Sequence, residues 1–273
     1  MSESGRASVA RAIRAALLTG SARAKVFAAR KVARDWRLGR LAPVFDVAMP
    51  DRPAWPASLE LLPPSQMPKR GKMGSQRNRI ALWHALAHIE FVAIDLALDM
   101  VGRFGATMPR GFIDDFLGVA ADEAMHFALL ERKLASLGTF YGALPAHAGL
   151  WESAHRTRHD VGARLAVVPM VLEARGLDVT PGMIDLFRRA GSDDAVAALE
   201  TIYAEEVGHV AYGSKWFHFL CGHHDLDPDC VMYWSTENEL LMDKIRERLE
   251  LDQSEVQWFC AQCQADVAAA QTP

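Results

Sequence analysis

The stretches Asp-Glu-Ala-Met-His at residues 122–126 and Glu-Glu-Val-Gly-His at residues 205–209 share one pattern, a glutamate followed three residues later by a histidine. Both lie in segments whose apolar residues recur at helical spacing. Because a helix turns by about 100° per residue, positions three apart lie on one face and can reach the same metal ion. The two stretches therefore predict two pairs of metal ligands, Glu123 with His126 and Glu206 with His209.

Two further acids each stand alone in a strongly apolar setting. Glu90 lies in His-Ile-Glu-Phe-Val-Ala-Ile, and Glu173 ends the stretch Val-Val-Pro-Met-Val-Leu-Glu. Glu90 precedes Glu123 by 33 residues, and Glu173 precedes Glu206 by the same 33 residues. A single Glu-x-x-His on a helix is usually a surface accident, but this spacing indicates a repeated helix pair. Each half supplies one lone glutamate and one Glu-x-x-His.

The six residues form a balanced ligand set for two divalent metal ions. Two such ions carry four positive charges and four glutamates carry four negative charges, so the buried site would be neutral. Without metal, four buried glutamates would repel one another and would have to take up protons. Carboxylate and imidazole ligands suit iron, with manganese as the alternative. The expected ligands of two iron ions are Glu90, Glu123, His126, Glu173, Glu206 and His209.

The surrounding sequence predicts an all-α protein, because almost no alternating strand pattern occurs between residues 76 and 220. Gly138 and Gly176 are expected to end the second and third long helices. Each long helix would measure about 40 Å, which suits a four-helix bundle. The long helices are expected at residues 76–103, 110–137, 150–176 and 193–220, with a shorter helix at 181–190 that Pro181 opens near its first turn.

Two segments precede the predicted bundle. Residues 6–40 are rich in Ala, Arg, Leu and Lys and contain no proline, which predicts one or two amphipathic helices. Residues 43–68 contain seven prolines, which exclude the interior of a helix or sheet, so this proline-rich arm should run extended over a surface. We expect three parts: a basic helical extension with the arm (1–75), the four-helix bundle (76–220) and a C-terminal helix and tail (221–273).

The net charge of −4 hides a strong asymmetry along the chain. Residues 1–79 contain 16 Lys or Arg against five Asp or Glu, whereas the remainder contains 14 against 29. A basic leader can contact an anionic partner such as nucleic acid or a membrane surface, but more often it is a solvated helix. No apolar run approaches the roughly 18–20 residues that cross a bilayer. We therefore expect a cytoplasmic protein without a membrane-spanning segment.

The four cysteines all lie in the last quarter of the chain, so they do not form a disulfide framework for the whole fold. A zinc site is an alternative use for them, with His223 or His224 as a further ligand, although a structural zinc site usually has two closely spaced pairs. A helix is expected at residues 229–249. The cysteines are Cys221, Cys230, Cys260 and Cys263.

Two histidines near Glu90 have alternative interpretations. His84 and His88 are four residues apart and share a face, which could form a metal-binding pair. However, His88 is rotated by about 200° from Glu90 on a helix, so these two cannot point at the same centre. A packing role, or a role in supporting the metal ligands, is the expected one for His88.

Two residues close to the other ligands also have two interpretations. Tyr203 lies one turn before Glu206 and is either a core tyrosine or a phenol that supports the ligands or takes part in redox chemistry. Pro169 lies four residues before Glu173 and removes one helix hydrogen bond. It either kinks the helix beside the site or is tolerated without a functional role.

At these residues the sequence resembles the ferritin-like superfamily of di-iron carboxylate proteins, and more closely an uncharacterised bacterial family of ferritin-like proteins of unknown function. The resemblance covers roughly residues 50–220, and the chain departs from that family after 220. It implies a ferritin-like four-helix bundle and oxidation chemistry with dioxygen or peroxide, or the handling of iron. The matching stretches are Arg-Pro-Ala-Trp-Pro (52–56), His-Ala-Leu-Ala-His-Ile-Glu (84–90), Asp-Glu-Ala-Met-His (122–126), Glu-Ala-Arg-Gly-Leu-Asp (173–178) and Glu-Glu-Val-Gly-His (205–209).

Three functions fit this pattern. The first is an oxidoreductase in which two ferrous ions react with dioxygen or peroxide and the oxidised centre attacks an unknown organic substrate, with electrons from an unidentified donor. A hydroxylase of modified tRNA, as in one branch of the superfamily, is a specific version, because the basic residues 69–79 could meet phosphates. The second is iron binding or storage, and the third is a bundle that metal merely stabilises. A homodimer is compatible with each of them.

Rubrerythrin-like electron transfer is disfavoured, because the chain has no second Cys-x-x-Cys pair to hold an iron–sulfur centre.

Overall fold

The computed structural model describes residues 6–68 and 75–223, and nearly all regular structure in these residues is helical. The expectation of an all-α protein is confirmed. Strands within the described ranges are limited to β1 (Ala7–Ser8) and β2 (Leu41–Ala42), a parallel pair two residues long that sequence analysis did not predict.

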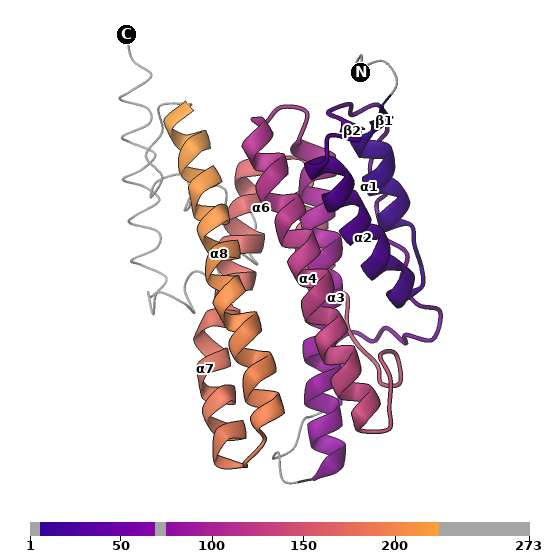
Figure 1. Ribbon diagram of the computed structural model, residues 1–273, viewed down its shortest axis with the longest axis vertical. Helices are drawn as coiled ribbons and strands as arrows, with labels where there is room; N and C mark the ends of the chain where they lie inside the picture. Colours follow the sequence, from indigo (N-terminus) through magenta and orange to yellow (C-terminus); the bar gives the residue numbers. More distant parts are fainter. Residues whose placement is uncertain (1–5, 69–74, 224–273) are drawn as a thin grey trace. The chain divides into compact units, whose positions relative to one another are not determined.

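The chain divides into two compact units, which are described separately. Unit 1 comprises Met1–Arg156 and Ser192–Ile202, and unit 2 comprises Thr157–Gly191 and Tyr203–Pro273. Figure 1 shows the order of the helices along the chain. Unit 1 contains α1 (Val9–Leu17), α2 (Ala22–Arg37), α3 (Gln76–Phe104), α4 (Arg110–Ser136), α5 (Gly149–Arg156) and the start of α8 (Asp193–His223); unit 2 contains α6 (Val161–Val167), the π-helix η3 (Val168–Glu173), α7 (Ala174–Arg189) and the rest of α8.

The N-terminal extension forms two helices, as predicted from residues 6–40. Ser8 and Ser21 cap α1 and α2, and each hydroxyl accepts a hydrogen bond from the backbone N–H three residues later. The apolar sides of α1 and α2 are buried, and α2 packs along α4. The extension is therefore part of the core of unit 1.

The helices α3 and α4 form the centre of unit 1 and pack along each other. Ser75 caps the start of α3, and Gly138 follows the end of α4 with a φ of 77°, the left-handed conformation that a glycine adopts most easily. The expectation that Gly138 ends this helix is confirmed. These two helices carry Glu90 and the first Glu-x-x-His.

The helix α3 corrects the expectation that no segment of the chain is apolar enough to cross a membrane. By length and composition it is apolar enough to cross a membrane, and 67% of its most apolar window is buried in the structure. Trp83, Phe91, Ile94 and Leu98 of this helix are each at most 1% exposed. This burial is what a core helix requires, since the side chains that would face lipid already face protein.

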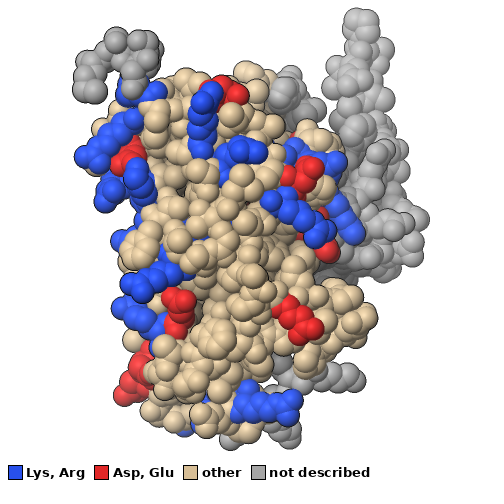
Figure 2. All heavy atoms as spheres, turned by 90° about the vertical axis from the view of Figure 1, so that its right-hand side faces the viewer, with Lys and Arg blue, Asp and Glu red and all other residues tan. Residues whose placement is uncertain are grey.

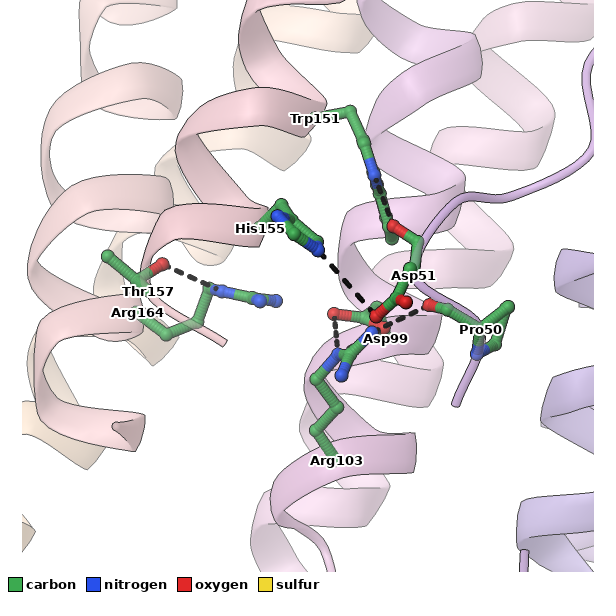
Figure 3. A network of polar contacts seen from close by, with 8 residues as sticks. All are labelled: Pro50, Asp51, Asp99, Arg103, Trp151, His155, Thr157 and Arg164. Atoms are coloured by element: carbon green, nitrogen blue, oxygen red, sulfur yellow. Dashed lines mark hydrogen bonds and ion pairs between the residues drawn. The ribbon is translucent and has the colours of Figure 1, made fainter. Parts of the chain in front are cut away.

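The proline-rich arm is held against α3 and α5 by polar contacts in unit 1 (Figure 3). The guanidinium of Arg103 donates a hydrogen bond to the carbonyl of Pro50 at 2.7 Å, and the indole N–H of Trp151 donates to the carbonyl of Asp51 at 3.0 Å. The His155 ring lies 3.7 Å from the Asp51 carboxylate. The backbone carbonyls of Pro50 and Asp51 thus accept hydrogen bonds from side chains instead of from the backbone of a helix or sheet.

The rest of the arm follows the predicted extended course with small exceptions. Within residues 43–68, regular structure is limited to the 3₁₀ turn η2 (Pro64–Gln66) and an isolated bridge between Leu61 and Ala146. Met49 and Leu59 are each 8% exposed, so the arm covers part of the core and anchors in it.

In unit 2 the structure corrects the predicted third helix, residues 150–176. The helix is interrupted after Arg156, and a new helix, α6, begins where the Asp160 carboxylate caps the N–H of Ala163 at 2.6 Å. Arg164 of α6 donates to the Thr157 hydroxyl at 3.1 Å across this break (Figure 3). The predicted third helix is therefore broken between Arg156 and Val161, because Asp160 caps a new helix there.

The end of the predicted third helix was also wrong. Gly176 lies inside α7, which continues to Arg189, and Pro181 lies inside the same helix instead of opening a separate one. A glycine often ends a helix by adopting the left-handed conformation, and Gly176 does not have a positive φ. The predicted helix at 229–249 and the zinc alternative at Cys230, Cys260 and Cys263 lie outside the described residues, while Cys221 is buried in α8.

Candidate metal centre

Three of the six predicted ligands meet in unit 1. Glu90 extends from α3, and Glu123 and His126 extend from one face of α4. The ring Nδ1 of His126 lies 3.2 Å from a carboxylate oxygen of Glu90 and 3.4 Å from one of Glu123. One ligand atom of each residue lies within 4.8 Å of the others, and none of the three is more than 6% exposed. This buried group could hold a metal ion.

Burial and mutual charge perturb the titration of this cluster. Burial, and after it the nearby charge of Glu123, raise the pKa of Glu90 to about 8 against the opposing effect of His126. Burial alone would lower the pKa of His126, but its hydrogen bonds to Glu123 and Glu90 and their charges raise it to about 11. Without metal, Glu90 and His126 therefore both hold a proton more tightly than isolated side chains do.

The donor set fits a divalent transition metal. Two carboxylates and one imidazole are hard and borderline ligands, and all three are withdrawn from water. A bound cation would take the place of the retained protons and would stabilise the ionised carboxylates. The fit therefore rests on the chemistry of the converging residues and on their burial.

The metal-free cluster predicts a marked pH dependence. Because Glu90 holds a proton up to about pH 8, metal binding must displace protons, and affinity should rise about tenfold per pH unit for each proton displaced. The stability of the metal-free fold depends on the protonation of Glu90 in the opposite direction. Because the pKa of Glu90 is raised in the native state, the contribution of Glu90 to stability is fully present below its ordinary pKa of 4.5 and is lost as the pH rises through about 8.

Calorimetric titration of metal-free protein with Mn²⁺ in two buffers of different ionisation enthalpy measures the protons released. Release of one or more protons at neutral pH is expected. An affinity that does not change with pH would contradict this account of the cluster.

The other buried acids of α3 have clear structural partners. The Asp95 carboxylate accepts two hydrogen bonds from the Lys25 ammonium, at 2.6 and 2.8 Å, and Asp99 is bonded by Arg103 at 2.7 and 2.8 Å. Glu90 instead faces a histidine and a second glutamate. Sequence analysis singled out Glu90 but not these two aspartates, although all three are acids in the same apolar helix. Each of the two aspartates therefore has a cationic side chain as its partner, and its burial is explained without a metal ion.

The histidines at 84 and 88 hold the loop that follows α4. The Nε2 of His84 accepts the N–H of Gly142 at 2.9 Å. The Nε2 of His88 lies 3.0 Å from the carbonyl of His147, so it carries the hydrogen, and its Nδ1 accepts the hydroxyl of Tyr141 at 2.8 Å. Burial lowers the pKa of both His84 and His88 to about 4, so both are neutral. Their observed contacts are packing contacts, and none of these hydrogen bonds involves a predicted ligand.

Sequence analysis did not single out Tyr141, which is 5% exposed and lies against the rings of Phe91 and Phe127 at centroid distances of 5.0 and 5.1 Å. These two phenylalanines directly follow Glu90 and His126 in the chain. No sequence signal marks Tyr141, because its partner His88 lies 53 residues away.

Unit 2 carries the other three predicted ligands. Glu206 and His209 lie on α8, and the His209 Nδ1 is 3.5 Å from a Glu206 carboxylate oxygen. His209 is buried and Glu206 is half-buried. Glu173 is half-buried and is the last residue of η3. Tyr203 is half-buried on α8, and its expected role stays a prediction.

The element η3 explains the effect of Pro169. A proline has no N–H to donate to the preceding turn, and here the chain forms a single turn of π-helix, a feature often found at functional sites. The ring of Pro169 fits against Gly213 of α8, which runs in the opposite direction (Figure 1). Glu173 lies four residues after Pro169, and His209 lies four residues before Gly213. In this antiparallel pair, both ligands therefore lie about one turn away from the contact, toward the same end of it.

We expect Gly213→Ala to lower the free energy of unfolding by about 1–3 kcal/mol, because overpacking at a helix contact is costly. An added Cβ would lie 2.5 Å from the Pro169 Cβ and 2.7 Å from its Cγ. Gly208→Ala on the same helix is the control, since nothing lies within 4 Å of its added Cβ. Urea denaturation of the metal-free variants measures both, and equal stabilities would show that α8 does not need this close approach.

A separate surface cavity lies in unit 1. Its volume is about 510 Å³. None of the six predicted ligands lines it. The lining residues are Asp51, Arg52, Trp151, Glu152, His155 and Arg156.

Comparison with known proteins identifies relatives without an assigned activity. A protein-family model described as "Protein of unknown function (DUF455)" matches residues 18–253. An "Uncharacterized protein" of Haemophilus influenzae is 42% identical over 180 residues, which cover 64% of this chain and 62% of that relative. The match thus spans less than two thirds of the relative's length. No solved structure matches the chain.

These matches confirm the resemblance to an uncharacterised bacterial family and correct its extent. The family match continues to residue 253, so the expectation that the chain departs from the family after residue 220 was wrong. It also begins at residue 18, within the helical extension. The ferritin-like relationship and the four-helix bundle stay predictions.

Proposed function

We propose that this chain, which belongs to the DUF455 family of proteins of unknown function, is a cytoplasmic di-metal oxidoreductase. It would use two iron ions, with manganese as the alternative, to oxidise or hydroxylate an organic substrate with dioxygen or peroxide. The observation that carries the proposal is the buried cluster of Glu90, Glu123 and His126. A modified tRNA is one candidate for the substrate.

The second half of the centre would come from α8, and helix geometry supports this. The start of α8 belongs to unit 1, where Lys133 of α4 bonds Asp194. The rise of a helix puts Glu123 about 15 Å along α4 from that bond and Glu206 about 18 Å along α8. The two lengths along the helices are similar, as a centre that uses both Glu123 and Glu206 would require.

The side of α8 on which the ligands lie gives independent support. Leu199 and Ile202 belong to unit 1 and are 2% and 5% exposed. Glu206 and His209 follow them by seven residues each, which is about two helical turns. Since α8 is one uninterrupted helix, both ligands would continue the stripe that unit 1 already buries. Glu173 would then complete the set through the η3 contact with α8.

In this proposal each residue of the chain has a defined task. The four glutamates hold the metal ions and balance their charge, and the two histidines complete the ligand set. The bound metal would supply the activation of dioxygen or peroxide. The apolar surroundings made by residues such as Phe91 and Phe127 exclude water from the cluster.

Anaerobic addition of ferrous ion, followed by exposure to dioxygen, tests the proposal. We expect saturation at about two ions per chain, as the charge of four glutamates requires, and protein-dependent consumption of dioxygen. Oxidation of far more iron than this, retained in the protein, would instead indicate storage. Failure to take up ferrous ion would contradict the proposal.

A further inference from the structure

The exposed side of α2 carries a row of arginines with an aromatic residue among them. Arg23, Phe27, Arg30, Arg34 and Arg37 recur at spacings of three and four residues, so they share one face of the helix. All five are exposed. From Arg23 to Arg37 the row is about 21 Å long at the rise of a helix. We name this row the arginine face of α2.

Few acids balance the positive charge of this face within its own segment of the chain. Asp35 is the one acid between residues 6 and 40, and its carboxylate already interacts with Lys31, Arg34 and Arg40. Figure 2 views the side on which α1 and α2 lie in Figure 1, and Lys and Arg gather in its upper part with fewer acids among them. The face therefore attracts a polyanion.

The aromatic member of the row distinguishes between classes of polyanion. Phe27 is 58% exposed, and the guanidinium of Arg23 lies 5.9 Å from the centre of its ring. A bulky ring kept in water within a row of arginines is an arrangement that binds unpaired bases, because bases stack on aromatic and guanidinium planes while arginines bind the phosphates.

A membrane surface fits the face less well. A helix that lies on a membrane inserts its apolar side, but the apolar side of α2 is already buried in unit 1. Val26, Ala29, Val32 and Trp36 are at most 6% exposed. The side that remains is charged, with one aromatic ring, which favours nucleic acid.

We propose that the arginine face of α2 binds single-stranded nucleic acid, with an unpaired base stacked on Phe27 and phosphates bound by the flanking arginines. This inference does not depend on the proposed oxidoreductase activity. A metal-free variant such as Glu123→Gln should bind nucleic acid as the unaltered chain does, so the two proposals can fail separately.

Fluorescence anisotropy with a labelled oligouridine at low ionic strength tests the proposal. Arg30→Glu/Arg37→Glu should weaken binding by about tenfold or more and should reduce the dependence of affinity on salt. Phe27→Ala should weaken binding by about tenfold through lost stacking, while the salt dependence is retained. The matched control is Arg132→Glu/Arg189→Glu, which makes the same charge change at exposed positions elsewhere and should leave binding unchanged.

Three results would overturn the proposal. They are no binding of the oligouridine by the unaltered chain, equal loss in the control variant, and binding to phosphatidylserine vesicles without binding to the oligouridine. Tighter binding to duplex DNA that Phe27→Ala does not affect would overturn the stacking role. Thermal melts check that all variants are folded. Phe27 and the substituted arginines are exposed, and Glu123→Gln replaces a buried side chain with one of the same shape.

Discussion

Replacing Asp95 with Asn will lower the free energy of unfolding by about 3–5 kcal/mol, the range for breaking a buried ion pair by removing one partner. Lys25 and Asp95 are both fully buried, and two short hydrogen bonds join them. Burial raises the pKa of Asp95 to about 6 and lowers the pKa of Lys25, while the charge of each partner opposes the shift of the other. The substitution would leave the ammonium buried without its counter-charge.

The size of this effect follows from the position of the pair. Lys25 belongs to α2 and Asp95 to α3, and the indole of Trp55 in the arm also donates to Asp95 at 2.9 Å. One carboxylate thus joins the helical extension and the arm to α3. Loss of the charge should loosen all three together.

Urea denaturation followed by circular dichroism measures the change. Asp46→Asn is the matched control, because Asp46 pairs with the exposed Arg11 and should cost less than about 1 kcal/mol. The double variant Lys25→Met/Asp95→Leu should recover most of the loss, since neither charge is then buried. A loss for Asp95→Asn no larger than that of the control would contradict the structural role assigned to the pair.

Glu123→Gln will weaken the binding of ferrous ion at least about 100-fold, because loss of a ligand exceeds the 10–100-fold cost of losing a residue that only supports one. Glu123 is fully buried and lies beside both Glu90 and His126. Glutamine retains the shape of the side chain but removes the negative charge, so the effect reports the loss of a ligand rather than a cavity.

Anaerobic calorimetric titration measures this affinity. Glu131→Gln is the control, since Glu131 lies on the same helix α4 outside the cluster. Its affinity for ferrous ion should match that of the unaltered chain. Equal affinities for Glu123→Gln and the control would show that Glu123 is not a ligand of the metal.

Local periodicity explains what could be predicted from sequence. The pair Glu123 and His126 shares a helix face whatever the rest of the chain does, and the apolar neighbours of Glu90 indicate burial directly. The helices of the extension follow from their composition for the same reason. These predictions needed no knowledge of distant contacts.

Contacts between distant residues could not be predicted in this way. Lys25 lies in a basic stretch that sequence analysis read as solvated, yet its partner is 70 residues away and both are buried. The ring of Pro169 in the π-helical turn fits against Gly213, 44 residues later, and local sequence does not indicate this contact. The break before α6 depends on one capping aspartate, Asp160, within a pattern that otherwise continues as a helix.

Elemental analysis of freshly purified protein tests the central claim most directly, namely that both halves of the chain form one metal centre. The account predicts about two iron or manganese ions per chain, as four carboxylates would balance, and loss of both in Glu123→Ala and equally in Glu206→Ala. Protein without bound metal that also takes up no ferrous ion under anaerobic conditions would contradict it.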